Sequence, residues 1–339
     1  MFNPMQNLSL LVADADQQLA KVFRMMLHKL GFEQVESTRS GREALEHLRE
    51  KPVDFLITEW NLQHVDGIEL LKHIRRDIDS PNPVLPVIML TGRAEREDVI
   101  AARDSGINEF VVKPFSAKTI YNRIERLIEY PRQFVIAEDF VGPDRRHKGT
   151  PPPGISNRRI VTPAAQDAPK DPAGAIRSGK GPRIWKPDFS LRRKLGLDTD
   201  LQTFITPNVL DQAQASIDAI SNDSLQWIKE NMAELNTLHR SMADGKQAPD
   251  LAHKLSETAL TLYTRAGTFG YHGAAEVAYM LYLFSRNRLD LKNHMHHTVV
   301  QKHNDVLRLI FANHMQGISG VGESAIIKEL HKLVEKYTT

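Results

Sequence analysis

Four polar side chains follow four short apolar runs in the first third of this chain of 339 residues. They are Asp14, Glu59, Thr91 and Lys113. Each run has the length and composition of a buried strand, and the carboxyl ends of parallel strands meet at one edge of a sheet, where ligands bind. That edge would bring together two acids, a hydroxyl and an amine, so we predict a charged site there.

The elements that would position these groups alternate along the chain. Short apolar or β-branched runs near 8–13, 33–37, 53–58, 86–90 and 107–112 predict strands. Amphipathic stretches at 16–30, 40–50, 67–77, 94–104 and 116–130 lie between and after them and predict helices. Such alternation is typical of a parallel sheet covered by helices on both faces, so the predicted fold class of this part is α/β.

Four motifs in this order resemble a response-regulator receiver (CheY-like) domain over residues 5–130. They are the first strand with its acidic tip at 8–14, the Asp66-Gly67 turn, the run 88–92 that carries Thr91, and the run 111–115 that carries Lys113. The resemblance implies a flavodoxin-like, doubly wound sheet of five parallel strands.

The resemblance also implies a phosphorylation site, and this chain departs from it at two positions. In the family, two adjacent carboxylates and an acceptor aspartate bind Mg²⁺, while a lysine and a hydroxyl offset the charge of the transferred phosphoryl group. Here the first acid is Asp14, but the second position is Ala15 and the acceptor position is Glu59. Asp16 lies where the first helix begins, so its carboxylate is expected to point elsewhere. A residual magnesium site of Asp14 and Glu59 is expected to be weak, and no cofactor is predicted.

The longer side chain of Glu59 is expected to occupy the space of an acyl phosphate and to form an ion pair with Lys113. Phe110, at the family's switch-aromatic position, would couple to Thr91. We therefore predict a pseudo-receiver that does not turn over phosphate. Two alternatives stay open: neutral drift in a domain kept for its fold, and a receiver that is still active.

Composition places the whole chain among soluble globular proteins, with 41% hydrophobic and 25% charged residues. The absence of cysteine excludes disulfides, thiolate catalysis and iron–sulfur clusters. No apolar stretch is long enough to span a bilayer, and no signal peptide is recognisable, so we expect a cytoplasmic protein. The net charge of +2 indicates no particular partner.

Residues 131–200 are predicted to form a basic, Pro/Gly-rich linker. Between positions 142 and 187 there are ten Lys/Arg against three Asp/Glu, a net charge of +7, with nine Pro and six Gly. Such a composition buries too little apolar surface to fold, and Pro151, Pro152 and Pro153 would be its stiffest part. Within it, the alternating apolar residues of 134–146 could pair as an edge strand or dock on the receiver.

Residues 201–339 carry only helical patterns and predict an all-α bundle. Thr206-Pro207 is a strong helix start. The fourth bundle helix carries residues at heptad spacing with Val299 and Ile310 flanking them; the heptad positions are Leu291, Met295, Thr298, Lys302, Val306, Leu309 and Asn313.

Two motifs of this bundle, residues 252–255 and 266–270, resemble a histidine phosphotransfer (HPt) domain, a four-helix bundle with an exposed phosphoryl-carrying histidine. The family histidine stands about seven residues before the first glycine. Leu260 occupies that position before Gly267, and His253 lies two helical turns earlier. We favour the register in which Leu260 is an exposed apolar residue at the centre of a docking face; the alternative is a two-turn insertion with His253 as the carrier.

These features together predict a bacterial two-component signalling protein that is not an enzyme. It would act as an adaptor or regulator without phosphorylation, and its partners would be a histidine kinase, a receiver or another signalling protein. The receiver face formed by 94–104, 107–112 and 116–130 would bind a partner or a second copy. One alternative is a working phosphorelay component with His253 as the carrier. The other is an adaptor that binds nucleic acid or another partner through the basic linker. Nucleic acid is the less favoured ligand, because few aromatic residues interleave with the basic ones.

Overall fold

The computed structural model describes residues 3–137, 139–145, 183–185, 190–196, 201–220, 225–243, 250–312 and 321–338. It divides into two compact units. The first contains Met1–Val112 and Ala117–Gln214, and the second contains Lys113–Ser116 and Ala215–Thr339. The sequence placed the domain boundary at 201, whereas the structure places it at Gln214, inside helix α9 (Pro207–Ile220).

The first unit contains the predicted five-stranded parallel sheet, in the order β2-β1-β3-β4-β5. Its strands are β1 (Ser9–Ala13), β2 (Gln34–Thr38), β3 (Phe55–Thr58), β4 (Val87–Thr91) and β5 (Glu109–Val112). Every residue of β3 and β4 is buried, as expected for central strands covered on both faces. The predicted α/β fold class and strand pattern are confirmed.

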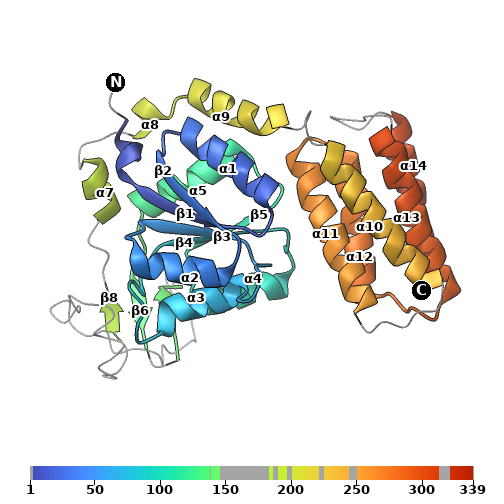
Figure 1. Ribbon diagram of the computed structural model, residues 1–339, viewed down its shortest axis with the longest axis horizontal. Helices are drawn as coiled ribbons and strands as arrows, with labels where there is room; N and C mark the ends of the chain where they lie inside the picture. The colour runs from blue at the N-terminus through green and yellow to red at the C-terminus, as the bar shows by residue number, and fades with distance from the viewer. Residues whose placement is uncertain are drawn as a thin grey trace, which may run out of the picture. The chain divides into compact units, whose positions relative to one another are not determined.

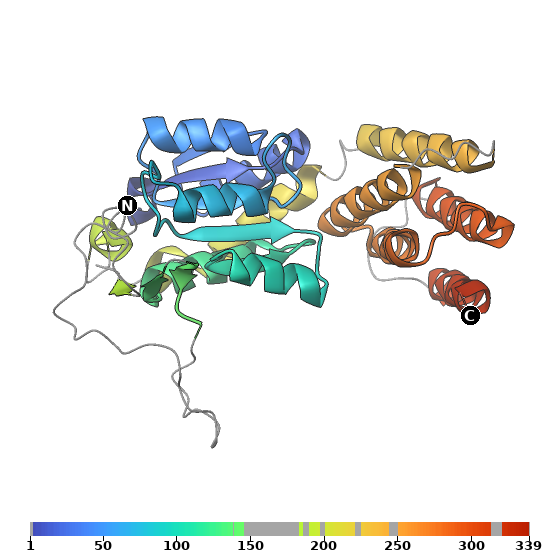
Figure 2. The ribbon, with the colours of Figure 1, turned by 90° about the horizontal axis from the view of Figure 1, so that it is seen from below.

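Five helices connect and cover the strands: α1 (Gln17–Lys29), α2 (Gly41–Glu50), α3 (Gly67–Arg76), α4 (Arg96–Asp104) and α5 (Ala117–Glu129). In Figures 1 and 2, α1 and α5 lie on one face of the sheet and α2, α3 and α4 on the other. Local capping fixes where they begin. Ser40 caps α2, and Asp66 forms a reciprocal capping box with Glu69 at the start of α3. A short 3-10 helix, η1 (Pro4–Asn7), precedes β1.

A second, antiparallel sheet is formed by residues that follow α5. Its order is β7-β6-β8, with β6 (Phe134–Ile136), β7 (Val141–Pro143) and β8 (Arg183–Trp185). The pairing predicted for residues 134–146 is therefore confirmed for β6 and β7. Two short helices of the same unit, α7 (Ser190–Leu195) and α8 (Leu201–Phe204), follow β8 (Figure 1).

The β6–β7 hairpin packs closely against the receiver-like sheet unit. Gly106 has φ +92°, and a Cβ atom there would lie 2.3 Å from the carbonyl oxygen of Val141. A Cβ on Gly142 would lie 2.6 Å from the Cα of Gly106. Only glycine at both positions allows the two backbones to approach this closely.

Arg75 of α3 lies fully buried beneath the same hairpin. Its guanidinium donates hydrogen bonds to the carbonyls of Gly106 and Pro83 and to Asn108 Oδ1, at 2.9–3.0 Å. The ring of Phe134 covers it at 5.2 Å, and Trp185 packs edge-on against Phe134. Burial lowers the pKa of Arg75 to about 9. The hairpin thus isolates a cation from water.

Helix α7 is held to the first unit by ion pairs and apolar contacts. Lys194 Nζ lies 2.7 Å from Asp54, and an Nη of Arg192 lies 3.0 Å from Glu129. Leu191 and Leu195 are buried. The prediction of a solvated linker over 131–200 is therefore wrong for the described parts of that range, because their few apolar residues find a surface to cover. Residues 146–182, 186–189 and 197–200, with the three prolines, lie outside the described residues.

The second unit contains five helices within its described part: α10 (Leu225–Ala243), α11 (Leu251–Thr268), α12 (His272–Asn287), α13 (His294–Ala312) and α14 (Val321–Thr338). Helix α11 packs against α10 and α12, α13 packs against α10 and α12, and α14 packs against α12 and α13. Trp227 of α10 is fully buried and stacks with Phe269, Tyr271 and Phe311. This aromatic cluster joins α10 and α13 to the turn between α11 and α12.

The buried face of α13 is centred on the flanking residues Val299 and Ile310 and not on the predicted heptad positions. Met295 and Leu309 are 39% and 43% exposed, whereas His303 and Asn304 are buried. His303 is fully buried; its Nδ1 lies 2.7 Å from the carbonyl oxygen of Val299, and its Nε2 has no hydrogen-bond partner among the described residues. Burial lowers the pKa of His303 from 6.5 to about 4.

This buried imidazole predicts acid sensitivity of the helical unit. The folded pKa is below the unfolded value, so the contribution of His303 to stability is fully present above about pH 6.5 and is lost as the pH falls towards 4. Its size is on the order of 3 kcal/mol. Chemical denaturation at several pH values should show this loss in the wild type and a flatter profile in His303→Leu. The exposed His272 of α12 gives the control, His272→Gln, whose profile should match the wild type; an unchanged slope in His303→Leu would contradict the prediction.

Candidate functional site

The strand tips meet at the carboxyl edge of the five-stranded sheet, as predicted. Ala13 at the end of β1 pairs in register with Thr58 at the end of β3, and the amide of Glu59 donates to the carbonyl of Ala13 at 2.8 Å. Asp14 and Glu59 therefore leave neighbouring strands at the same level. Thr91 of β4 pairs with Val112 of β5, so Lys113 follows one residue beyond Thr91 on the adjacent strand.

Asp14 and Asp16 have separate structural roles. Asp14 is 5% exposed, and its Oδ1 accepts a hydrogen bond from the amide of Asp16 at 2.9 Å. Asp16 is the N-cap of α1, and its Oδ1 accepts the amides of Gln18 and Leu19, both at 3.1 Å. The prediction that the Asp16 carboxylate is directed elsewhere is confirmed. Ala15, between them, offers no ligand atom.

Glu59 is half-buried, and its Oε1 accepts a hydrogen bond from the amide of Trp60 at 2.6 Å. The chain then turns tightly into α3, where a Cβ on Gly67 would lie 2.2 Å from the carbonyl oxygen of Glu59. The amide of Gly67 donates to the carbonyl of Trp60 at 2.7 Å. This turn explains the Asp66-Gly67 motif and fixes the backbone that carries Glu59.

The hydroxyl, the amine and the aromatic residue are also placed near this edge. Thr91 is fully buried, and its Oγ1 accepts the amide of Arg93 at 3.3 Å. Lys113, directly after β5, is 2% exposed. Phe110 packs partly buried against the core formed with α2, α3 and α4. The predicted ion pair of Lys113 with Glu59 and the coupling of Phe110 to Thr91 stay predictions.

One pair of residues at this edge was missed from the sequence. The guanidinium of Arg93 donates to Asn61 Oδ1 at 2.9 and 3.2 Å and lies 5.5 Å from the ring centroid of Trp60. It links the loop after β3 to the loop after β4. The only sequence signal is that Asn61 and Arg93 each lie two residues after a tip residue, Glu59 and Thr91.

Comparisons with known proteins agree with this geometry. The family described as response regulator receiver domain matches residues 10–125. Chemotaxis protein CheY-3 of Vibrio cholerae is 35% identical over 124 residues, which cover 37% of this chain and 94% of that protein. The chain belongs to the response-regulator receiver family. Chemotaxis protein CheY of Pseudomonas aeruginosa is 34% identical over 36% of this chain and 97% of its own length. The solved structure of Vibrio cholerae CheY4 is 25% identical over 35% of this chain and 97% of that one, with a TM-score of 0.33.

The strand tips of this receiver keep two of the carboxylates that would hold the magnesium ion implied by its family. Only Asp14 and Glu59 supply carboxylates at the tips, since Ala15 replaces one acid and Asp16 caps a helix. Across the described ranges, no group of three or more His, Asp or Glu side chains is placed to hold a metal ion. Mg²⁺ keeps several water ligands and is usually bound through one or two carboxylates, so Asp14 and Glu59 would be the residues that hold it, without the second acid that the family supplies at position 15.

The helical unit that follows the receiver places its two predicted residues differently from expectation. His253 on α11 is exposed. Leu260 is only 4% exposed, so the prediction of an exposed leucine is wrong. The reason is that α11 is buried around most of its circumference, including at Ser256, Thr258 and Thr264. Glu257, one turn after His253, is half-buried.

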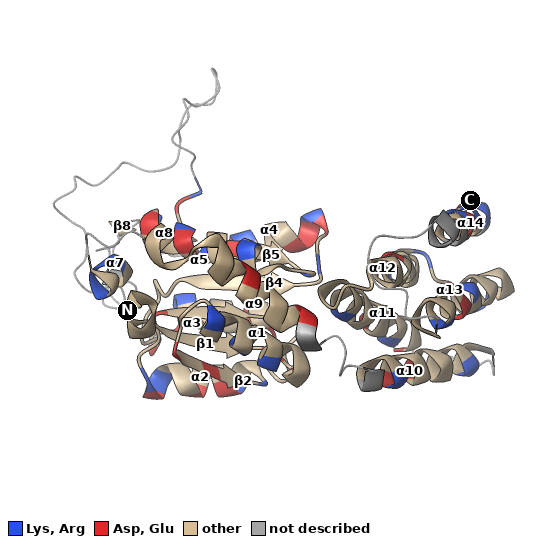
Figure 3. Ribbon diagram, turned by 90° about the horizontal axis from the view of Figure 1, so that it is seen from above, with Lys and Arg blue, Asp and Glu red and all other residues tan. Residues whose placement is uncertain are grey.

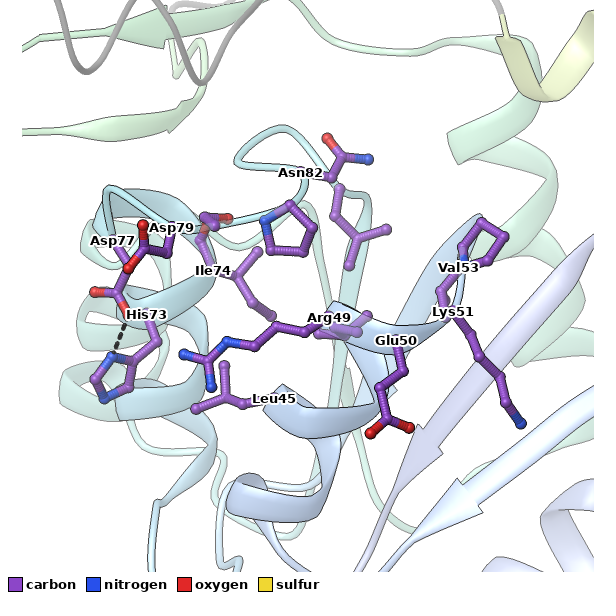
Figure 4. A pocket seen from close by; sticks show the side chains of 15 residues that line it. Leu45, Arg49, Glu50, Lys51, Val53, His73, Ile74, Asp77, Asp79 and Asn82 are labelled. Carbon is purple, nitrogen blue, oxygen red and sulfur yellow. Dashed lines mark hydrogen bonds and ion pairs between the residues drawn. The ribbon is translucent and has the colours of Figure 1, made fainter.

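A groove at the opposite, amino edge of the receiver is unrelated to the tip residues. It has a volume of about 450 Å³ and lies between the C-terminal ends of α2 and α3. Figure 4 shows Leu45 and Ile74 beside Arg49, with His73 paired to Asp77.

Within the described residues, no helix is both long and apolar enough to cross a membrane.

Proposed function

We propose that this protein is a two-component signalling adaptor that works without phosphorylation, through a pseudo-receiver and a helical docking domain. The observation that carries the proposal is the acid set at the strand tips. Glu59 replaces an acceptor aspartate, Ala15 replaces a metal ligand, and the carboxylate of Asp16 is occupied by the amides of α1. Phosphoryl transfer in such a site depends on positioning and on charge compensation by the metal, and both would be lost.

In this proposal the receiver keeps its docking surface while losing its chemistry. Glu59 is held by the Trp60 amide, and Arg93 fastens the two loops beside it. These contacts favour one conformation of the loops. A working receiver would instead change between two conformations on phosphorylation. The surface made by α4, β5 and α5 would then present itself constantly to a signalling partner, and the protein would be no enzyme.

The test is direct phosphorylation of the full chain. We expect no phosphoryl adduct after incubation with acetyl phosphate and Mg²⁺, as measured by intact mass and localised by fragmentation. Chemotaxis protein CheY of Pseudomonas aeruginosa is a suitable positive control. An adduct on Glu59 or Asp14 would contradict the proposal.

A second candidate is a working phosphorelay component in which His253 carries phosphate. It is favoured by one observation: His253 is exposed on α11, whereas Leu260 is buried. An exposed neutral imidazole is a competent phosphoryl acceptor. Incubation with a phosphorylated receiver would give label that His253→Ala abolishes and the control His272→Ala keeps. Absence of label in the wild type would leave the adaptor as the better explanation.

A role of the basic linker in nucleic-acid binding is less supported. In its described part, Lys194 and Arg192 are already paired with Asp54 and Glu129. A salt-dependent shift of DNA mobility would be needed to revive this alternative.

A further inference from the structure

Three arginines surround one buried carboxylate on the edge strand of the receiver. Glu109 of β5 is 6% exposed. An Nη of Arg123 lies 3.1 Å from its Oε2, while Arg126 and Arg132 lie 3.4 and 3.7 Å from its Oε1. The three guanidinium groups therefore converge on a single point of the surface.

One carboxylate does not balance this cluster. Only Arg123 donates a hydrogen bond to Glu109, and no other acid lies within ion-pair distance of the three arginines in the part of the chain that the structure describes. Four charged groups therefore carry a net charge of about +2. Each guanidinium has five N–H donors, so most donors of Arg126 and Arg132 are available to another acceptor.

The cluster is open to solvent and has an apolar neighbour. The side chains of Arg123, Arg126 and Arg132 are 38%, 46% and 39% exposed. Tyr130, one turn after Arg126 on the same face of the chain, is 76% exposed. A cavity of about 110 Å³ is lined by Glu109, Arg126, Tyr130 and Arg132 among others. The same cavity is lined by Asp54, whose carboxylate is already paired with Lys194.

We propose that this arginine cluster, with Tyr130 at its rim, is the docking site for an acidic segment of a partner protein. The inference rests on the proposed function, because it names the partner chemistry of the α4–β5–α5 surface. Arginine pairs with carboxylates through two parallel hydrogen bonds, and excess positive charge speeds encounter with an acidic partner. Glu109 shows that the cluster accommodates a carboxylate, with one hydrogen bond from Arg123 and ion pairs with Arg126 and Arg132.

A nucleic-acid backbone is the less suitable occupant. A polyanion needs a track of cations, whereas α5 interleaves its arginines with Glu125 and Glu129, as the alternating colours of α5 in Figure 3 illustrate. A short acidic segment needs only the cations of this cluster and does not have to run along α5 past the two glutamates.

The test uses the full chain and a short fluorescent peptide of alternating glutamate and alanine, followed by anisotropy at low ionic strength. Arg126→Gln/Arg132→Gln removes the excess charge but leaves the Arg123–Glu109 hydrogen bond that the fold uses. We expect this variant to bind the peptide about five- to tenfold more weakly. The matched control is Arg42→Gln/Arg49→Gln on α2, which removes the same charge elsewhere and should change binding less than about twofold.

The outcomes separate this inference from the function on which it rests. Equal loss in both double variants would show general charge attraction and overturn the docking site. Tighter binding of a single-stranded oligonucleotide than of the peptide, lost in Arg126→Gln/Arg132→Gln, would overturn the assignment to a protein. Peptide binding that appears only after treatment with acetyl phosphate would contradict the phosphate-independent function while keeping the site.

Discussion

Replacing Ala15 and Glu59 together by aspartate is expected to make the receiver take up a phosphoryl group from acetyl phosphate in the presence of Mg²⁺. The double change supplies the missing carboxylate beside Asp14 and shortens the side chain at position 59, so that it no longer fills the space of the phosphate. Magnesium affinity should rise by at least about 10- to 100-fold, the size of effect that even indirect partners of metal ligands produce.

Intact mass and a magnesium titration measure both effects. Each single substitution corrects only one defect. Ala15→Asp should bind Mg²⁺ more tightly but form no phosphoryl adduct, and Glu59→Asp should reach neither the magnesium affinity nor the phosphorylation of the double variant. Glu46→Asp on α2 is a control for shortening an exposed glutamate. A folded double variant that binds Mg²⁺ but takes no phosphate would mean that another feature, such as the Arg93–Asn61 link, closes the site.

Replacing Phe134 by alanine is expected to destabilise the first unit by about 3–5 kcal/mol, the usual cost of deleting a buried phenylalanine side chain. The ring of Phe134 is 3% exposed, covers the buried guanidinium of Arg75 and packs on Trp185. Its loss would admit water to a cation that has only neutral partners. For a unit of this size the transition should fall by roughly 6–20 °C in thermal denaturation.

Two matched variants make this result specific. Phe134→Leu keeps most of the buried volume and should cost only about 1–2 kcal/mol. Phe140→Ala removes a half-buried ring of the same hairpin, stacked on Arg145, and should cost less than about 1 kcal/mol. If the effects of Arg75→Met and Phe134→Ala on the free energy of unfolding were strictly additive, the contact between the two side chains would contribute no stability.

The sheet and the tip residues were predictable because their signals are local. Runs such as those before Asp14 and Lys113 have the period and length of buried strands, and parallel pairing then places their ends together. The position of Asp16 at a helix start also sufficed to predict that its carboxylate is directed away from the tip site, and the structure adds that it is the N-cap of α1. These inferences need no knowledge of distant contacts.

The second sheet could be predicted only in part. The hairpin of β6 and β7 shows as alternating apolar residues, but β8 has three residues and pairs with β6 from far along the chain. Nothing in a basic, proline-rich composition indicates that Trp185 will pack on Phe134. The composition of this segment predicted a solvated linker, but tertiary contacts fold its described parts onto the first unit.

The predictions of which helix residues are buried failed for a different reason. In α11 the hydroxyls of Thr258 and Thr268 donate to carbonyls one turn earlier, so these polar residues satisfy themselves inside the core. Leu260 was assigned to the surface because the resemblance put it at the position of an exposed histidine, and the polar residues around it gave no sign that this side of the helix is covered. In α13, His303 and Asn304 are likewise polar residues that are buried.

The pairing of β8 with β6 has a topological consequence. The residues on either side of the stretch 146–182 belong to one unit, so the length of that stretch does not set the tether between the two units. Insertions or deletions within that stretch should leave any intramolecular communication unchanged, whereas a few residues added after Gln214 should alter it.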